Sequence, residues 1–242
     1  MQDLDFLQTE EMEQLLERAR DKYDVAFEPV RIGGLTLDIL QIADMEAYID
    51  YLAETTRERL ELPFWAKIWP ASVILGYYLG TLPPEKPLDM LELGAGVGLC
   101  GLAAASRGHK VLITDNHPDA LLFSRINILR NNLQEHASVQ AADFTSDRLS
   151  RRFNCILGAE VLYQEDTYPQ LVRFLTEHLG TSPDDEIILS ASNARKSPSF
   201  FQRAQETFQL SHKTLECRDK AAADSTDQES HRISIYRMKA RQ

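Results

Sequence analysis

Residues 91–98 read LELGAGVG, and this stretch decides the fold. The apolar run that ends here is typical of a buried strand, and the small apolar residues at 99–105 are typical of a helix. A strand that turns on glycines into a helix is characteristic of nucleotide-binding α/β folds. Glycine lets a ligand approach the backbone, and the first N–H groups of the helix face that ligand. The stretch therefore predicts a ligand site at this turn.

The chain after residue 88 repeats the order of strand and helix. Strands are expected at 88–93, 110–115, 137–143, 153–160, 185–192, 210–217 and 232–238, with helices at 98–108, 118–132, 164–180 and 197–208. Strands that alternate with helices predict a parallel sheet covered on both faces. The last two strands have no helix between them, which predicts an antiparallel terminal strand. We therefore expect an α/β fold with a Rossmann-like, doubly wound, seven-stranded sheet.

The N-terminal part has a different pattern. Its apolar spacing predicts, in order, a helix at 3–22, a β-hairpin at 23–44 and a charged helix at 45–60. The pair Gly33-Gly34 marks the turn of the hairpin. We predict an N-terminal extension at 1–62 and the α/β domain at 63–242.

Composition narrows the class of protein. The formal net charge of −11 disfavours non-specific binding to nucleic acid, because such binding needs a basic surface. No apolar run approaches the roughly 20 residues of a membrane span, and the acidic N-terminus lacks the layout of a signal peptide. Three scattered cysteines without a CxxC pair predict neither disulfides nor a metal site. We expect a cytoplasmic protein without a metal, and a monomer because no coiled-coil pattern occurs.

The spacing of the glycines argues against a dinucleotide. The dinucleotide fingerprint is G-x-G-x-x-G, but after Gly94 and Gly96 the next glycines are Gly98 and Gly101. No Gly-Lys-Ser/Thr sequence occurs, which excludes a P-loop. The turn is therefore better suited to another adenosine ligand.

Two acids indicate the charge of that ligand. Glu92 lies two residues before the first glycine, where a carboxylate would repel a pyrophosphate and attract a cationic amino-acid tail. Asp115 ends the next strand, about 20 residues after the turn, where an acid binds ribose hydroxyls. S-adenosylmethionine has an ammonium group, a sulfonium and a ribose but no phosphate. These two acids therefore favour S-adenosylmethionine as the cofactor.

Longer stretches resemble a known family. LELGAGVGLCGLAAA, VLITDNHPDAL and LGAEVLYQEDTYPQL resemble the class I, seven-strand S-adenosylmethionine methyltransferases. The chain is most similar to their protein-lysine branch, methyltransferase family 16. That branch also has a tryptophan segment upstream, here PFWAKIWPASVILGYYL at 63–79, and an acid-x-x-tyrosine motif, here Glu160 to Tyr163. The resemblance covers roughly residues 25–210 and implies that 63–242 is the methyltransferase domain.

The resemblance implies a set of cofactor contacts. Besides Glu92, which its charge and position indicate, the cofactor-binding residues would be Trp69, Gly94, Ala95, Gly96, Asp115, Asp143, Phe144 and Ala159. Asp143 would bind the adenine amino group, and Phe144 stands where the family often has a tryptophan that stacks near the adenine. Ala159 would contact the cofactor through its backbone. Trp69 would line the cofactor pocket.

The resemblance also implies the acceptor. A lysine side chain of a protein would be the methyl acceptor, with Glu160 and Tyr163 as the catalytic residues. Glu160 would orient the substrate amine, although the family more often has aspartate there. Tyr163 and Trp69 would offer ring faces to the amine or to its methylated products, which remain cationic, because aromatic faces attract cations.

Two other functions share the cofactor residues. A small-molecule N-methyltransferase would differ only in the acceptor cleft, and a non-catalytic cofactor-binding scaffold would lack an acceptor. A nucleic-acid methyltransferase is disfavoured by the net charge and by the absence of an Asn-Pro-Pro-aromatic motif. The sequence therefore predicts a protein substrate as partner, with no nucleic acid and no membrane.

Overall fold

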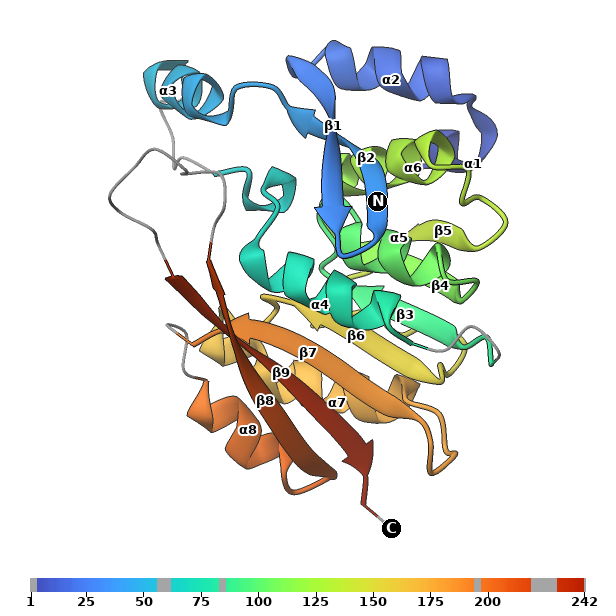
Figure 1. Ribbon diagram of the computed structural model, residues 1–242, viewed down its shortest axis with the longest axis vertical. Helices are drawn as coiled ribbons and strands as arrows, with labels where there is room; N and C mark the ends of the chain where they lie inside the picture. The colour runs from blue at the N-terminus through green and yellow to red at the C-terminus, as the bar shows by residue number, and fades with distance from the viewer. Residues whose placement is uncertain (1–3, 56–61, 83–85, 194–196, 219–229, 242) are drawn as a thin grey trace.

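A seven-stranded sheet is the centre of the computed structural model, which describes residues 4–55, 62–82, 86–193, 197–218 and 230–241 (Figure 1). Its strand order is β5-β4-β3-β6-β7-β9-β8. The strands are β3 (Asp89–Leu93), β4 (Lys110–Asp115), β5 (Ala137–Ala141), β6 (Cys155–Ala159), β7 (Glu186–Ser192), β8 (Phe208–Arg218) and β9 (Ser230–Ala240). β3 to β7 pair in parallel, and β9 lies antiparallel between β7 and β8. The expected α/β fold with an antiparallel terminal strand is confirmed.

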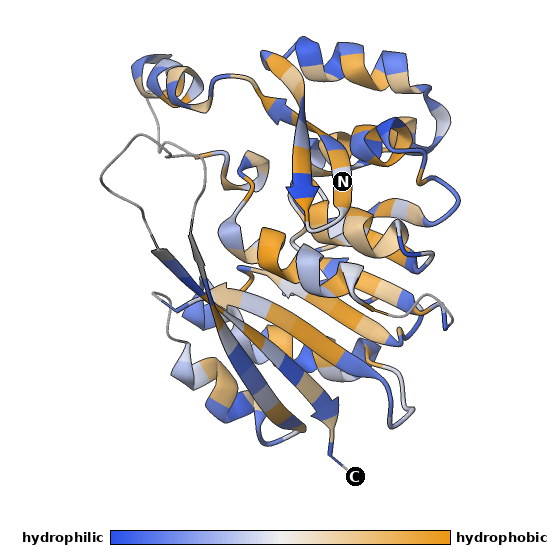
Figure 2. Cartoon of the chain, viewed as in Figure 1, coloured by the Kyte–Doolittle hydropathy of each residue, from blue (hydrophilic) through white to orange (hydrophobic). Residues whose placement is uncertain are grey.

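Helices cover both faces of the sheet. In chain order, these helices are η1 (Phe64–Ala66), α4 (Pro70–Gly80), α5 (Leu99–Ala105), α6 (Pro118–Arg130), η2 (Glu165–Thr167), α7 (Tyr168–His178) and α8 (Pro198–Ala204). Successive residues of β3 point to opposite faces: Met90 packs in the core under α4, α5 and α6, and Leu91 packs in the core under α7 and α8. Figure 2 shows the central strands as largely hydrophobic, as expected for a sheet buried on both faces.

The N-terminal part adds two short helices, a hairpin and a third helix. They are α1 (Phe6–Thr9), α2 (Met12–Arg20), β1 (Val25–Ile32), β2 (Leu35–Ile42) and α3 (Met45–Thr55). The expectation of one helix at 3–22 was wrong. The extended backbone of Glu10 ends α1, and a capping box of Glu11 and Gln14 begins a separate helix, α2. The hairpin is confirmed, and Gly33 provides its turn with a φ of 61°.

The hairpin packs on the face of the sheet that carries α6. The side-chain oxygen of Asn127 in α6 accepts the backbone N–H of Leu40 at 2.7 Å, and α2 also lies against α6 (Figure 1). Ile39 and Leu40 belong to the same hydrophobic core as α5 and α6. The division at residues 62 and 63 stays a prediction. None of the described helices is long and apolar enough to cross a membrane.

Candidate active site

A cleft of about 820 Å³ opens at the carboxyl ends of β3, β4 and β6. This is the edge at which open α/β sheets bind ligands. The cleft brings together every residue that the sequence singles out: Trp69, Glu92, Gly94, Ala95, Gly96, Asp115, Asp143, Phe144, Ala159, Glu160 and Tyr163. Its lining also includes residues that sequence reasoning missed, among them Phe64, Lys67 and Ser72. All three lie in the tryptophan segment at 63–79, which was the available signal for them.

The glycine turn between β3 and α5 requires glycine for two reasons. Gly94, Gly96 and Gly98 have φ values of 55°, 55° and 83°, which side chains rarely adopt. A Cβ atom on Gly96 would also lie 2.4 Å from the carbonyl oxygen of Trp65. The turn therefore packs directly against the tryptophan segment, and residues of both line the cleft.

Asp115 is held by the backbone on both sides. Its Oδ2 accepts the N–H of Gly96 at 2.9 Å, and its Oδ1 accepts the N–H of His117 at 2.9 Å. Only 6% of the residue is exposed, and this burial raises the pKa of the carboxyl above its ordinary value. The aspartate thus ties the end of β4 to the glycine turn.

Glu92 is buried beneath the first turn of α5. Its Oε2 accepts the N–H of Gly101 at 2.9 Å, and 2% of the residue is exposed. Burial raises its pKa to about 8, although the Gly101 hydrogen bond opposes that shift. A Cβ on Gly101 would lie 2.5 Å from this oxygen, so glycine is needed there to admit the carboxylate. From the sequence alone, Gly101 was apparent only as a mismatch with the dinucleotide spacing.

The loop after β5 carries Asp143 and Phe144, which are half-buried. The Oδ1 of Asp143 accepts the N–H of Thr145 at 2.8 Å and its hydroxyl at 2.7 Å. Asp147 accepts the N–H of Asp143 at 2.8 Å. These bonds fix the loop in a compact turn, and both residues line the cleft.

Glu160 has an unusual backbone at the end of β6. Its φ is 56°, and such a conformation costs energy for a residue with a side chain. Two bonds to β7 hold it: its N–H donates to the carbonyl of Ser190 at 2.8 Å, and its Oε1 accepts the N–H of Ser192 at 2.8 Å. Hydrogen bonds to β7 therefore fix the direction of the Glu160 carboxylate.

The mouth of the cleft is aromatic. Tyr163 and Phe64 are exposed by 59% and 60%. Trp69 is half-buried; its Nε1 donates to the carbonyl of Phe64 at 3.1 Å, and the ammonium of Lys67 lies 4.8 Å from its ring centroid. The position of Lys67 shows that this ring can receive an alkylammonium group.

The chemistry of the lining suits S-adenosylmethionine. Buried carboxylates at Glu92 and Asp115 could hold an ammonium group and a ribose, and backbone groups of the glycine turn border both. Within the described lining, Lys67 is the single lysine or arginine, which does not suit a pyrophosphate. In the described part of the chain, no group of three His, Cys, Asp or Glu residues could hold a metal ion.

Comparisons with known proteins agree with this chemistry. Residues 56–207, more than half of the 242-residue chain, match the model of the family described as lysine methyltransferase. The chain is 31% identical over 174 residues to protein N-lysine methyltransferase METTL21A of Mus musculus, covering 68% of this chain and 78% of that protein. It is 38% identical over 132 residues to METTL21A of Danio rerio, covering 52% of this chain and 59%, less than two thirds, of that protein.

A solved structure supports the fold. The S-adenosylmethionine-dependent methyltransferase from Agrobacterium tumefaciens matches with a TM-score of 0.60 at 17% identity, covering 93% of this chain and 79% of that one. The family match and the mouse relative establish more than the fold, and the resemblance noted in the sequence is confirmed. The chain therefore belongs to the lysine methyltransferase family, whose cofactor is S-adenosylmethionine.

Proposed function

We propose that this protein transfers a methyl group from S-adenosylmethionine to the ε-amine of a lysine in another protein. The observation that carries the proposal is the position of Glu160 and Tyr163. Both lie in the same cleft as the buried carboxylates of Glu92 and Asp115, and Tyr163 is at its open mouth. The two relatives named above are protein N-lysine methyltransferases, which supports a protein acceptor.

The cofactor would lie along the carboxyl ends of β3, β4 and β5. Bound there, S-adenosylmethionine supplies an electrophilic methyl group on its sulfonium. Glu92 would bind the ammonium group, Asp115 the ribose hydroxyls, and Asp143 with Phe144 the adenine. Gly94, Ala95, Gly96 and Ala159 would contact it through the backbone, and Trp69 would line its pocket.

The acceptor lysine must be unprotonated to attack the methyl group. Trp69 and Tyr163 present ring surfaces at the mouth, and partial burial among rings disfavours the charged amine. Its proton would leave to water at the open mouth. The lone pair of the amine must then point along the line of transfer, because methyl transfer is an in-line displacement.

Glu160 would orient that amine. Since the N–H of Ser192 holds its Oε1, the carboxylate has a set direction before the substrate arrives. We propose that it accepts an N–H of the acceptor amine or of the neighbouring peptide backbone. Such an orienting group contributes to the rate by positioning the nucleophile rather than by removing its proton.

We also propose that the protein acts in the cytoplasm as a monomer, without nucleic acid or membrane as partner. The net charge of −11 supports the exclusion of nucleic acid, and the spacing of its cysteines favours a reducing compartment.

The test is incubation of the protein with methyl-labelled S-adenosylmethionine and cell extract. The proposal expects label on a protein band that resists nuclease and, after digestion, on a lysine residue. Label only in the small-molecule fraction would support a small-molecule N-methyltransferase instead. If wild type and Glu160→Gln both bind S-adenosylhomocysteine but neither labels any component, a cofactor-binding scaffold becomes the better reading.

A further inference from the structure

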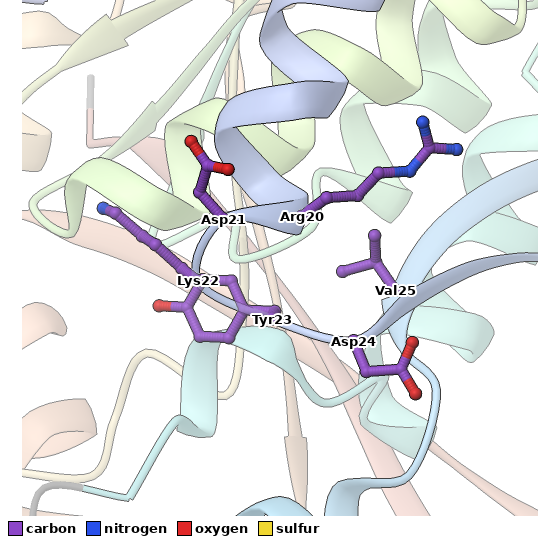
Figure 3. Close-up of a pocket in the computed structure, with 6 residues that line it drawn as sticks. All are labelled: Arg20, Asp21, Lys22, Tyr23, Asp24 and Val25. Carbon is purple, nitrogen blue, oxygen red and sulfur yellow. The ribbon is translucent and has the colours of Figure 1, made fainter.

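Asp119 joins the N-terminal extension to the domain. It lies in the first turn of α6, with 9% of the residue exposed. Its Oδ2 accepts the hydroxyl of Tyr23 at 2.7 Å, and its Oδ1 accepts the ammonium of Lys22 at 2.6 Å. Figure 3 shows Lys22 and Tyr23 projecting to one side of the turn after α2, with Arg20 and Asp24 on the other.

Two hydrogen bonds connect Asp119, through His117, to Asp115 of the proposed cofactor site. Its backbone N–H donates to Nδ1 of His117 at 3.2 Å, and the N–H of His117 donates to Oδ1 of Asp115 at 2.9 Å. His117 is the N-cap of α6, so the same bonds also define where that helix begins. A continuous set of hydrogen bonds thus runs from Tyr23 to the carboxylate expected to hold the ribose.

Aromatic contacts also connect Tyr23 to the loop that carries Asp115. The ring of Tyr23 meets Trp65 edge-on at 5.8 Å, and Trp65 stacks on His117 at 5.0 Å with 22° between the ring planes. The carbonyl oxygen of Trp65 in turn lies 2.4 Å from the position that a Cβ of Gly96 would take. Tyr23 therefore contacts, through one intervening residue, both the loop that carries Asp115 and the glycine turn.

We propose that Tyr23 is a positioning residue for cofactor binding: through Asp119 and His117 it holds the 115–119 loop in the conformation that binds the ribose. The proposal rests on the role proposed above for Asp115. A loop held in its binding conformation loses less conformational freedom when the ligand binds, so affinity rises. Without the Tyr23 hydroxyl, Asp119 would lose its neutral donor, and the loop would sample other conformations.

The donor role of Tyr23 is independent of pH in the working range. Burial, reinforced by the Asp119 carboxylate, raises the pKa of the Tyr23 phenol well above its ordinary value. The hydroxyl therefore remains protonated and continues to donate to Asp119.

The test is the Tyr23→Phe variant, which keeps the ring and removes the hydroxyl. We expect S-adenosylhomocysteine, measured by calorimetry, to bind about 3- to 10-fold more weakly, a loss comparable to the net contribution of one typical hydrogen bond. The KM for the cofactor should rise by a similar factor, and kcat at saturating cofactor should stay near the wild-type value. Tyr51→Phe is the matched control, because Tyr51 lies in the same extension and is 59% exposed.

A purely structural role for Tyr23 predicts a different result. In that case Tyr23→Phe would lower the Tm of the free and ligand-bound protein equally and leave the affinity unchanged, which would overturn the proposal. Lys22→Met provides a second check, since it removes the other side-chain donor to Asp119 from an exposed position; we expect weaker binding in the same direction.

Asp115→Asn separates this proposal from the assignment on which it rests. If Asp115→Asn weakens binding and Tyr23→Phe does not, the positioning role is wrong and the ribose assignment survives. If Asp115→Asn leaves the affinity unchanged, the ribose assignment itself is wrong, and the positioning proposal is overturned with it.

Discussion

The carboxylate of Glu92 accepts the backbone N–H of Gly101 at 2.9 Å, in the first turn of the helix that follows the glycine turn. Residue 101 must lack a side chain for this bond, because a Cβ there would lie 2.5 Å from the Glu92 oxygen and 2.7 Å from Ile113. The acid and the fourth glycine of the motif therefore form one structural unit beside the cleft.

Cofactor affinity should depend on pH through Glu92. Its pKa is about 8 in the free protein, and the cationic tail of the cofactor would favour the ionised form. Affinity should therefore rise as the pH approaches about 8, by at most about tenfold per pH unit. At higher pH it should fall again, because an α-amino group ordinarily loses its proton at about pH 8 and the ligand is then no longer cationic. Calorimetry in buffers of different ionisation enthalpy should detect a released proton below pH 8.

Burial also raises the pKa of Asp115, so both carboxyls can contribute to the pH dependence of the wild type. The Glu92→Gln variant removes the contribution of Glu92 alone. The amide can still accept from Gly101, but the steepest part of the pH dependence near neutrality should disappear. An identical pH profile in the variant would show that Glu92 does not meet the ammonium group.

The stability of the free protein should depend on the same carboxyl with the opposite sign. A folded-state pKa raised from 4.5 to about 8 gives a contribution that is complete below pH 4.5 and is lost as the pH rises to 8. Between pH 5 and 8 the Tm should thus fall more in wild type than in Glu92→Gln. Differential scanning calorimetry without ligand measures the difference, and parallel curves would contradict the prediction.

Gly101→Ala should destabilise the fold despite alanine's higher helix propensity. The new methyl would displace Glu92 and Ile113, and overpacking of this kind costs about 1–3 kcal/mol. Urea unfolding measures the change, and S-adenosylhomocysteine binding should weaken as Glu92 moves. The matched control is Gly80→Ala in α4, where no atom lies within 4 Å of the added methyl and no loss of stability is expected.

Glu160→Gln should lower kcat by about 10- to 100-fold, because an orienting carboxylate near the reacting amine is replaced by a neutral amide. The affinity for S-adenosylhomocysteine should change little, since the amide oxygen can still accept from Ser192. Single-turnover methylation of the labelled substrate, together with calorimetry, separates the two effects. Equal losses in both measurements would instead place Glu160 in cofactor binding.

Tyr163→Ala should weaken binding of the protein substrate. Because Tyr163 is 59% exposed at the mouth, its removal should leave the fold intact and raise the KM for the protein substrate several-fold. Tyr51→Ala, equally exposed on α3, is the control and should behave as wild type. If both variants methylate equally well, the ring of Tyr163 does not contact the substrate.

The fold and the cofactor could be predicted from the sequence because their signals are local. Each strand, glycine turn and helix of the sheet is a contiguous pattern of residues, and parallel pairing places the ends of β3, β4 and β6 at one edge. Candidate residues at the carboxyl ends of strands, such as Asp115 and Glu160, consequently came together in one cleft. The break between α1 and α2 was missed, because leucine spacing alone does not reveal a capping box.

The remaining features depend on contacts between residues far apart in the chain. Composition and spacing by themselves determined the class of fold and the methyl donor. Only the tertiary structure decided that Tyr23 bonds to Asp119, 96 residues away, that the carbonyl of Trp65 lies against Gly96, and that β7 holds Glu160 in a left-handed conformation. Such contacts arise when separate elements pack, so no pattern within a short window of sequence encodes them.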